Sequence, residues 1–303
     1  MMGDAPQVQA LADYVARYPK LVVVTGAGCS TGSGIGDYRD SEGRWKHAQP
    51  IQYADFMASQ KVRQRYWARS LLGWPQFARA EPNSGHRALV ALERADHLVG
   101  LITQNVDGLH QFAGHQRVLD LHGRLDWVSC QECHSRVTRA SIQDRLMALN
   151  GAMLPVLHEQ QRLEQSSLAG RAAPAPDGDA QLTVINAGFK VPECLACGGV
   201  LKPDVVFYGQ SVPKPWVEQA YEWVAQADGL LVVGSSLMVF SSFRFCRAAA
   251  ASDTPIAVLN RGVTRADDLA ILKVNGECGQ TLCQVLKILG IEVPGANSIG
   301  SRQ

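Results

Sequence analysis

The chain has 303 residues, of which 46% are hydrophobic and 19% are charged, and its formal net charge is +1. This length and composition are sufficient for a sizeable core and suit one large domain with an appended module, or two domains. A net charge near zero gives no general attraction to nucleic acid or anionic lipid, so neither partner is expected. No apolar run reaches the length of a membrane span, and no secretory signal is visible at the N-terminus. These absences predict a cytoplasmic protein whose eight cysteines stay reduced.

Four short apolar runs along the chain predict strands that are buried on both faces. They are residues 21–24, 98–102, 230–233 and 256–259. Helical patterns at residues 86–94 and 216–227 lie between some of these runs. The alternation predicts an α/β fold with a parallel sheet covered by helices, whose ligands bind at the carboxyl ends of the strands. All four runs end in polar or glycine-rich segments, "TGAGCSTGSG", "TQNVDG", "GSS" and "NRG", which predicts one crevice lined from four places.

The first of these segments belongs to a longer stretch, "VVVTGAGCSTGSGIGDYRD". Gly26 and Gly28 lack Cβ atoms, so the backbone amides of this loop can approach a pyrophosphate closely. The G-x-G-x-x-x-G spacing differs from the G-x-G-x-x-G of dehydrogenases, and a plain tight turn is an alternative. Asp37, Tyr38 and Arg39 can close over a nucleotide; the alternative for them is a solvated helix start.

The second segment, "TQNVDGLH", places two amides, a carboxylate and an imidazole directly after a predicted strand. These are the side chains of Gln104, Asn105, Asp107 and His110. Such a density of functional groups exceeds what a surface turn requires, so the segment is a candidate binding site.

Two regions interrupt the alternation of strands and helices. Residues 49–79 read as helical, and residues 127–202 contain the pairs Cys130-x-x-Cys133 and Cys194-x-x-Cys197. Four thiolates predict one structural zinc ion, because every ligand position is filled. Sixty residues separate the pairs, which is tolerable because the cost of closing a loop grows slowly with its length. Within this insertion "AGRAAPAPDGD" reads as a loop or disordered segment, and the tail after residue 294 as frayed. Four further cysteines are expected to be buried thiols: Cys29, Cys246, Cys278 and Cys283.

The combination of motifs resembles the sirtuin family. The motifs are "GAGCS", "GIGDYR", "TQNVDGLH", "LHG", two C-x-x-C pairs, "LKPDVVFYG", "GSSL" and "NRG", in this order over nearly the whole chain. "RQRYWAR", "GWPQF" and "VVGSSLMVFSSFRF" are most similar to the class II branch, of the mitochondrial sirtuin-four type, which implies the mitochondrial matrix if the protein is eukaryotic. The resemblance implies an NAD-dependent protein lysine deacylase with a Rossmann-like domain, a smaller zinc-binding and helical domain, and acyl-lysine proteins as substrates. We expect a monomer.

On this resemblance, residues 1–42, 83–126 and 203–303 form the NAD-binding domain. Residues 43–82 form a helical module, and residues 127–202 a zinc-binding module. The pattern departs from the family at Gly36, where proline is usual, at Gln210, where an acidic residue is common, and in the long insertion.

The resemblance also implies a set of site residues. Phosphates are assigned to Gly26, Ala27, Gly28 and Ser30, and a mobile cofactor loop to Asp37, Tyr38 and Arg39. Nicotinamide and its ribose are assigned to Gln104, Asn105, Val106 and Asp107. Phosphate and adenosine groups are assigned to Gly234, Ser235, Ser236, Asn260, Arg261 and Gly262, with Cys278 at the adenine end. The acyl-lysine is assigned to Val205, Val206 and Phe207, and the catalytic base is His122.

Sirtuin-type chemistry breaks the bond between nicotinamide and ribose and passes the acyl group from lysine to ribose. Asn105 would orient the ribose and a water, Asp107 would accept from the nicotinamide amide, and Gln104 would bond ribose hydroxyls. His122 would then remove a proton from a ribose hydroxyl, because the unperturbed pKa of an imidazole is about 6.5. His110 is a rival base, for which a helix-start or packing role is the favoured interpretation.

The segment "RYWAR" places Tyr66 and Arg69 on one face of a helix. Class III sirtuins carry a similar Tyr-x-x-Arg pair that reads acidic acyl chains, so we hypothesise a preference for acyl groups bulkier than acetyl. The alternative is a packed tyrosine and a surface arginine.

Three other functions are compatible with parts of the sequence. A mono-ADP-ribosyltransferase would share the first bond cleavage. A zinc-ribbon nucleic-acid binder is disfavoured by the near-neutral charge. A hydride-transferring dehydrogenase is disfavoured by the glycine spacing.

Overall fold

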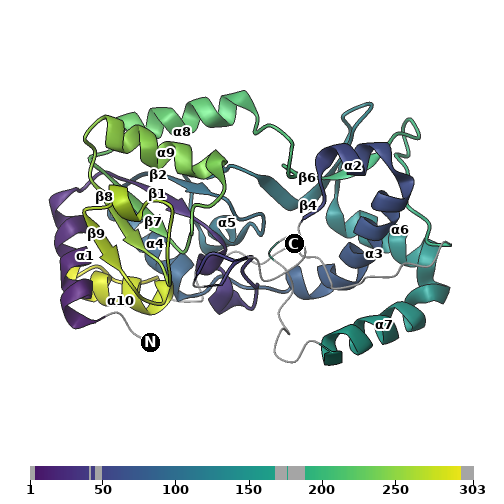
Figure 1. The fold of residues 1–303 in the computed structure, drawn as a ribbon, viewed down its shortest axis with the longest axis horizontal. Coiled ribbons are helices and arrows are strands. Elements are labelled where there is room, and N and C mark those ends of the chain that lie inside the picture. Colours follow the sequence, from purple (N-terminus) through teal and green to yellow (C-terminus); the bar gives the residue numbers. More distant parts are fainter. Residues whose placement is uncertain (1–3, 41, 45–49, 168–175, 177–187, 295–303) are drawn as a thin grey trace. The chain divides into compact units, whose positions relative to one another are not determined.

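A computed structural model describes residues 4–40, 42–44, 50–167, 176 and 188–294 (Figure 1). The chain divides into two compact units. The first unit comprises Met1–His47, Glu81–Leu121 and Val212–Gln303, and the second comprises Ala48–Ala80 and His122–Ser211. The segments 122–126 and 203–211, which the sequence analysis placed with the NAD-binding domain, lie in the second unit.

The first unit contains a six-stranded sheet in which every neighbouring pair is parallel. Its order is β3-β2-β1-β7-β8-β9. The strands are β1 (Leu21–Thr25), β2 (Leu98–Thr103), β3 (Val118–Asp120), β7 (Gly229–Val233), β8 (Ile256–Leu259) and β9 (Leu272–Val274). The four predicted strands and the parallel α/β fold are confirmed. The outer strands β3 and β9, of three residues each, were not predicted.

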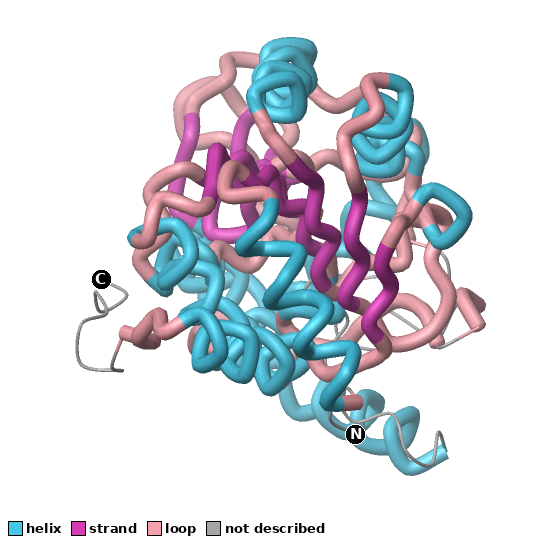
Figure 2. The backbone as a smooth tube through the Cα atoms, turned by 90° about the vertical axis from the view of Figure 1, so that its left-hand side faces the viewer, coloured by secondary structure: helices cyan, strands magenta, loops and turns pink. Residues whose placement is uncertain are grey.

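Alternate residues of β1, one of the two middle strands of the sheet, enter two separate hydrophobic clusters. Leu21 and Val23 pack with α1 (Ala5–Arg17), α4 (Ser84–Arg94) and α10 (Cys278–Leu289). Val22 and Val24 pack with α8 (Lys214–Gln226) and α9 (Phe240–Ala251). Figure 1 shows α8 and α9 on one side of the sheet and α1 and α10 on the other, and Figure 2 shows the strands between the helix layers. Because both faces are covered, the strands are continuous apolar runs. The predicted helices correspond to α4 and α8 and are confirmed.

The second unit contains a three-stranded antiparallel sheet of order β5-β4-β6. Its elements are β4 (Gly123–Cys130), β5 (Arg136–Thr138), β6 (Leu201–Val205), α2 (Tyr53–Ala58), α3 (Gln60–Phe77), α6 (Arg139–Asn150), the 3-10 turn Gly151–Met153 and α7 (Leu154–Ser167). Helices α2 and α3 confirm the helical prediction for the described part of residues 49–79.

A fully buried arginine joins α3 to α6. The guanidinium of Arg139 lies over the rings of Trp67 and Trp74, at 5.5 and 4.9 Å from their centroids. It also donates to the carbonyl and hydroxyl oxygens of Ser70, each at 3.0 Å. A planar guanidinium suits this stacked and hydrogen-bonded position better than an ammonium group would.

Among the described residues, no helix combines the length and hydropathy needed to cross a bilayer. The predicted loop at residues 169–179 lies outside the described residues except for Pro176, and so does the tail from residue 295.

Candidate active site and metal centre

The loops that follow β1, β2, β7 and β8 are linked by backbone hydrogen bonds at the carboxyl edge of the parallel sheet. The amide of Gly28 donates to the carbonyl of Gly234 (2.8 Å), and the amide of Gln104 donates to the carbonyl of Thr25 (3.0 Å). The amide of Gly234 in turn donates to the carbonyl of Leu259 (2.9 Å). The predicted convergence of these four loops is therefore confirmed.

Two glycines are required by the packing of these loops against each other. A Cβ added at Gly28 would lie 2.8 Å from the carbonyl oxygen of Gly234. A Cβ at Gly234, whose φ is +62°, would lie 2.3 Å from the amide nitrogen of Cys29. The sequence argument for Gly28 concerned access to a pyrophosphate; the structure adds that any side chain here would push two loops apart.

Three buried polar side chains meet behind the glycine loop. The Ser30 hydroxyl donates to Oδ2 of Asp107 (2.7 Å) and accepts from Nδ2 of Asn105 (3.0 Å). Nδ2 of Asn105 also donates to the carbonyl of Gly26 (3.0 Å), and Oδ1 of Asp107 accepts from the amide of Leu109 (2.9 Å). These bonds fix the amide and the carboxylate before any ligand arrives, because buried polar groups bonded on several sides lose their freedom to rotate.

The side chain of Gln104 connects the loops after β2 and β7. Its Nε2 donates to the hydroxyl of Ser235 (2.6 Å), and that hydroxyl accepts from the amide of Leu237 (3.1 Å). The sequence placed Gln104 and Ser235 at different parts of one ligand; the structure places their side chains in direct contact.

The other residues assigned to the cofactor lie around these loops. Ala27 is in the 3-10 turn Ala27–Cys29; Val106, Ser236 and Gly262 are half-buried, Asn260 is buried and Arg261 is exposed. Nδ2 of Asn260 donates to the carbonyl of Arg261 (2.9 Å). Cys278, the first residue of α10, is buried, and burial raises the pKa of its thiol to about 12. Cys29 and Cys246 are buried as well, and Cys283 is half-buried.

Asp37, Tyr38 and Arg39 are half-buried and lie outside any helix. The second 3-10 turn of the glycine loop, Thr31–Ser33, ends before them, and Nη1 of Arg39 donates to the carbonyl of Gly43 (2.7 Å). The alternative of a solvated helix start at these three residues is therefore not what the structure shows.

His110 occupies the first turn of α5 (Leu109–Ala113) and is fully buried. Its Nε2 lies 2.9 Å from the hydroxyl of Thr25, and its ring packs against the rings of His86 (4.8 Å) and His115 (5.4 Å). The packing interpretation of His110 is thus confirmed. His86 and His115 were not recognised from the sequence as part of this cluster.

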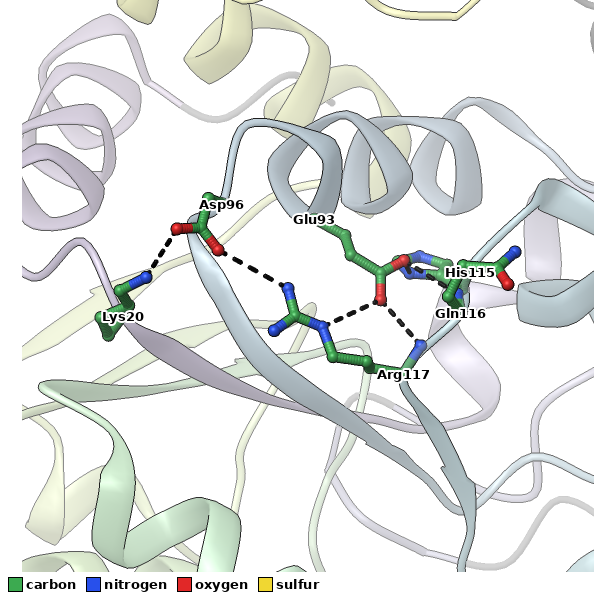
Figure 3. A network of polar contacts seen from close by, with 6 residues as sticks. All are labelled: Lys20, Glu93, Asp96, His115, Gln116 and Arg117. Carbon is green, nitrogen blue, oxygen red and sulfur yellow. Dashed lines mark hydrogen bonds and ion pairs between the residues drawn. The ribbon is translucent and has the colours of Figure 1, made fainter.

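A buried carboxylate contacts His115, one member of this histidine cluster (Figure 3). Glu93, near the end of α4, accepts from the backbone amides of Gln116 (3.0 Å) and Arg117 (2.8 Å) and from Nδ1 of His115 (3.0 Å). Burial by itself raises the pKa of Glu93, but the hydrogen bonds from His115 and from the two amides outweigh it and lower the pKa to about 2. The carboxylate therefore ties α4 to the segment that leads into β3.

In the second unit the four paired cysteines converge on one point. The sulfur atoms of Cys130 and Cys197 are 3.5 Å apart, those of Cys133 and Cys194 are 3.7 Å apart, and all four lie within 4.8 Å of one another. A tetrahedral zinc site with Zn–S bonds of about 2.3 Å requires sulfur separations of about 3.8 Å. The donor set therefore fits one zinc ion with all its positions filled.

The backbone around the thiols holds the two cysteine pairs together. The amide of Gln131 donates to the carbonyl of Val200 (2.8 Å), and a Cβ at Gly199 would lie 2.9 Å from the sulfur of Cys130. The hydroxyl of Ser135 lies 3.3 Å from the sulfur of Cys194 and is the main cause that lowers the pKa of this thiol to about 6. Thiolate character is what a zinc ligand requires.

His122 and the segment assigned to the acyl-lysine are joined within the second unit. The amide of Val206 donates to the carbonyl of His122 (2.8 Å). At the next residue, Gly123, φ is +76° and a Cβ would lie 2.1 Å from the carbonyl oxygen of Asp204. The motif "LHG" therefore needs its glycine so that the start of β4 can lie against the end of β6.

Two residues assigned to the substrate are in ring contact. The ring of Tyr66 lies 5.4 Å from that of Phe207, and Phe56 packs edge-on against both, at 5.5 and 5.1 Å. Tyr66 is buried and Arg69, one turn further along α3, is half-buried. The structure thus brings Tyr66 to the segment of Val205, Val206 and Phe207, and adds Phe56, which carried no sequence signal.

Comparison with known proteins decides the family. A family model described as Sir2 family matches residues 26–241. The chain belongs to the Sir2 family, the sirtuins. It is 50% identical over 287 residues to the NAD-dependent protein deacetylase 2 of Bradyrhizobium diazoefficiens, covering 94% of this chain and 100% of that protein. It is 53% identical over 274 residues to an NAD-dependent protein deacetylase of Xanthomonas campestris, a match that covers 90% of this chain and 89% of that protein. A solved Sir2 structure with a peptide and NAD+ is similar at 25% identity and a TM-score of 0.72, covering 94% and 99%.

One of the departures from the sirtuin pattern has a structural substitute. Oε1 of Gln210, at the position where an acidic residue is common, accepts from the amide of Phe207 (3.1 Å). A glutamine oxygen can fill this acceptor role as a carboxylate would.

A buried lysine of this sirtuin also acts on the same segment. Nζ of Lys202 donates to the carbonyls of Pro203 (2.9 Å) and Val205 (2.6 Å) and lies 4.8 Å from the ring centre of Phe207. Burial lowers the pKa of Lys202 to about 8. This role could not be predicted from the sequence, because the partners of Lys202 are backbone carbonyls.

The buried imidazoles of the first unit predict a specific loss of stability in acid. Burial, assisted by the charges of His115 and Arg87, lowers the pKa of His86 to about 3, and burial lowers that of His110 well below its ordinary value. The unfolded chain binds protons on these imidazoles below about pH 6.5, whereas the folded chain does not. Protonation of these imidazoles therefore costs no stability above about pH 6.5. Below that pH the free energy of unfolding declines, and for His86 the decline continues to about pH 3.

We expect the free energy of unfolding to fall by up to about 1.4 kcal/mol per pH unit for each of the two imidazoles once the pH is below about 6.5. Urea unfolding at pH 7.5, 6.5, 5.5 and 4.5 measures this slope. The variant His110→Gln should reduce the slope by up to about 1.4 kcal/mol per pH unit, the value that corresponds to one proton. A free energy of unfolding that is flat from pH 7 to pH 5 would contradict the prediction.

Proposed function

We propose that this sirtuin is an NAD-dependent protein lysine deacylase, which releases nicotinamide and transfers the acyl group of an acyl-lysine to ADP-ribose. The relatives named NAD-dependent protein deacetylases support this reading. The observation that carries it is the buried cluster of Ser30, Asn105 and Asp107, preformed beside a glycine loop at the carboxyl edge of a parallel sheet.

The residues of the first unit suit a dinucleotide. Gly26 and Gly28 leave no room for a Cβ, because they lie directly against Gly234 and Ser235. Their own amides donate to the carbonyls of Val233 and Gly234, so in our proposal the phosphates are bound by other amides and hydroxyls of these loops. When bound, NAD would supply the bond between nicotinamide and ribose, which would break as the acyl oxygen of the substrate lysine took the place of nicotinamide on the ribose carbon. In our proposal Asp107 accepts from the nicotinamide amide, Asn105 orients the ribose, and Gln104 bonds ribose hydroxyls. The remaining loop residues, from 234 to 236 and from 260 to 262, hold the phosphate and adenosine groups.

The second unit supplies the base and the substrate segment in this proposal. His122 would accept a proton from a ribose hydroxyl, so that this oxygen could bond to the acyl carbon. The bond between that carbon and the lysine nitrogen would then break, with one water consumed to complete the products. The peptide adds as a strand beside Val205, Val206 and Phe207, where backbone hydrogen bonds would bind it. Zinc on the four cysteines is structural and takes no part in the chemistry.

The test is to incubate the protein with NAD and acyl-lysine peptides and to follow nicotinamide release. We expect release that depends on the peptide, and mass spectrometry should show free lysine and acyl-ADP-ribose in equal amounts. ADP-ribose attached to protein in place of these products would support the transferase alternative. Absence of nicotinamide release with every peptide would refute the proposal.

We also propose that Tyr66 and Arg69 favour an acyl chain that carries a carboxylate. The contact of Tyr66 with Phe207 supports this, since Phe207 is assigned to the acyl-lysine. A charge-assisted hydrogen bond is typically worth about 1.5–3 kcal/mol. The variant Arg69→Ala is therefore expected to lower kcat/KM for a glutaryl-lysine peptide about 10- to 100-fold and to change that for an acetyl-lysine peptide less than about threefold.

The matched control is Arg65→Ala, which removes an exposed arginine from the same helix. It should leave both peptides unaffected. An equal loss with acetyl, glutaryl and lipoyl peptides in the Arg69 variant would show that Arg69 only supports the fold.

The assignment to the class II branch is also a proposal, supported by "RQRYWAR" on α3 and "VVGSSLMVFSSFRF" from β7 into α9. By sequence motif we also propose a division into an NAD-binding domain (1–42, 83–126 and 203–303), a helical module (43–82) and a zinc-binding module (127–202). It differs from the division into compact units, which groups 122–126 and 203–211 with the second unit.

A further inference from the structure

We propose that His86 is a positioning residue for the nicotinamide end of the site. Its imidazole sets the direction of the Ser30 hydroxyl and, through that hydroxyl, holds the carboxylate of Asp107. This inference rests on the proposed function, in which Asp107 accepts from the nicotinamide amide. Nothing in the sequence around His86 indicated it, since the residue lies in the first turn of α4, far along the chain from both partners.

The first step fixes the tautomer of His86. Its Nδ1 lies 3.2 Å from the backbone nitrogen of Asn83. A backbone N–H can only donate, so Nδ1 must accept and carries no proton. The side chain of Asn83 completes a capping box by accepting from the amides of Gly85 (2.8 Å) and His86 (3.3 Å). The cap of the helix therefore dictates which nitrogen of the imidazole is bare.

The second step places the single proton. His86 is fully buried, and this burial keeps the imidazole neutral over the working pH range. A neutral imidazole with a bare Nδ1 carries its proton on Nε2. Nε2 is therefore the donor in its 3.5 Å contact with the hydroxyl oxygen of Ser30, which is the longest contact of the series.

The third step gives the direction of the Ser30 hydroxyl. A hydroxyl has two acceptor lone pairs and one proton. His86 donates to one lone pair, and Nδ2 of Asn105 donates to the other at 3.0 Å. The hydroxyl proton must then point to Oδ2 of Asp107, at 2.7 Å.

The consequence is that both carboxylate oxygens of Asp107 accept a fixed hydrogen bond. Oδ2 of Asp107 receives the Ser30 hydroxyl, and Oδ1 receives the amide of Leu109. Without the imidazole, Ser30 would have a free lone pair and other rotamers, and Asp107 would lose a fixed donor. A site that binds an amide through one carboxylate depends on that carboxylate being oriented in advance.

The molecule contains a matched control in His110. Its imidazole is equally buried, its pKa is lowered as well, and its ring packs at 4.8 Å from that of His86. Its Nε2 bonds the hydroxyl of Thr25, however, and not that of Ser30. Loss of His110 should therefore disturb packing to a similar degree without turning the Ser30 hydroxyl.

The experiment compares His86→Asn, His86→Gln and His110→Asn. The asparagine amide falls near the position of Nδ1 and can serve only the cap, whereas the glutamine amide reaches the position of Nε2 and can donate to Ser30. The readouts are the inhibition constant of nicotinamide, KM for NAD, KM for an acetyl-lysine peptide and the thermal midpoint. We expect His86→Asn to raise the nicotinamide constant about tenfold, as for the loss of about one hydrogen bond, with peptide KM changed less than about twofold. His86→Gln should stay within about threefold of the parent, and His110→Asn within about twofold.

Equal nicotinamide constants in His86→Asn and His110→Asn would overturn the inference. If His86→Asn does not fold, Ser30→Ala is tested in its place. This variant removes the hydroxyl that connects His86 to Asp107 and should raise the inhibition constant of nicotinamide about tenfold. An unchanged constant in that variant also overturns the inference. A parent protein that releases no nicotinamide is a different result, since it refutes the proposed function itself.

Discussion

Replacing Cys194 with serine is expected to unfold the second unit and to abolish zinc binding. Cys194 is one of four sulfur atoms that lie within 4.8 Å of one another, and it joins two segments of the chain separated by 60 residues. Structural zinc typically contributes about 10–16 kcal/mol. This exceeds the net stability of most domains, about 5–15 kcal/mol. A site with three ligands would therefore not hold the two Cys-x-x-Cys pairs together.

Zinc content by elemental analysis and thermal unfolding followed by circular dichroism measure the effect. The parent should contain one zinc per chain, and a strong chelator should reproduce the behaviour of the variant. Cys283→Ser is the control, since this half-buried thiol on α10 lies outside the cluster and should leave the zinc content unchanged. The prediction fails if Cys194→Ser retains one zinc per chain and the midpoint of the parent.

The central part of the fold could be predicted because burial on both faces leaves a local signal. Strands β1, β2, β7 and β8 are four to six residues long and almost entirely apolar, so each is visible without knowledge of its neighbours. Strands β3 and β9 are shorter and only partly buried, and "VLD" and "LKV" do not differ from many loop segments. Their pairing depends on the neighbouring strand, which the local sequence does not show.

The site divides in the same way. Asn105 and Asp107 were visible because they follow a strand directly, and the cysteines because of their spacing. His86 and Lys202 were not, because each takes its role from backbone groups or from a hydroxyl that folding brings to it. Gly234 is a similar case, since only the approach of the Cys29 amide shows why no side chain fits there.

Replacing His122 with alanine is expected to lower the rate of deacylation by a factor of about 10²–10⁴, the usual contribution of a general base. The cleavage between nicotinamide and ribose needs no base, so that step should survive. Exchange of labelled nicotinamide into NAD, in the presence of the acyl peptide, measures the first step alone. We expect this exchange to remain within about tenfold of the parent while formation of free lysine falls.

The backbone contacts of His122 make this variant informative. Its carbonyl, and not its side chain, accepts from the amide of Val206, so alanine keeps that hydrogen bond and the pairing of β4 with β6. The thermal midpoint of the variant then reports what the imidazole itself contributes to stability, separately from this pairing. His158→Ala, which removes an exposed histidine from α7, should turn over like the parent. If His122→Ala formed free lysine at the rate of the parent, the proton would have another acceptor, and the role proposed for His122 would have to be given up.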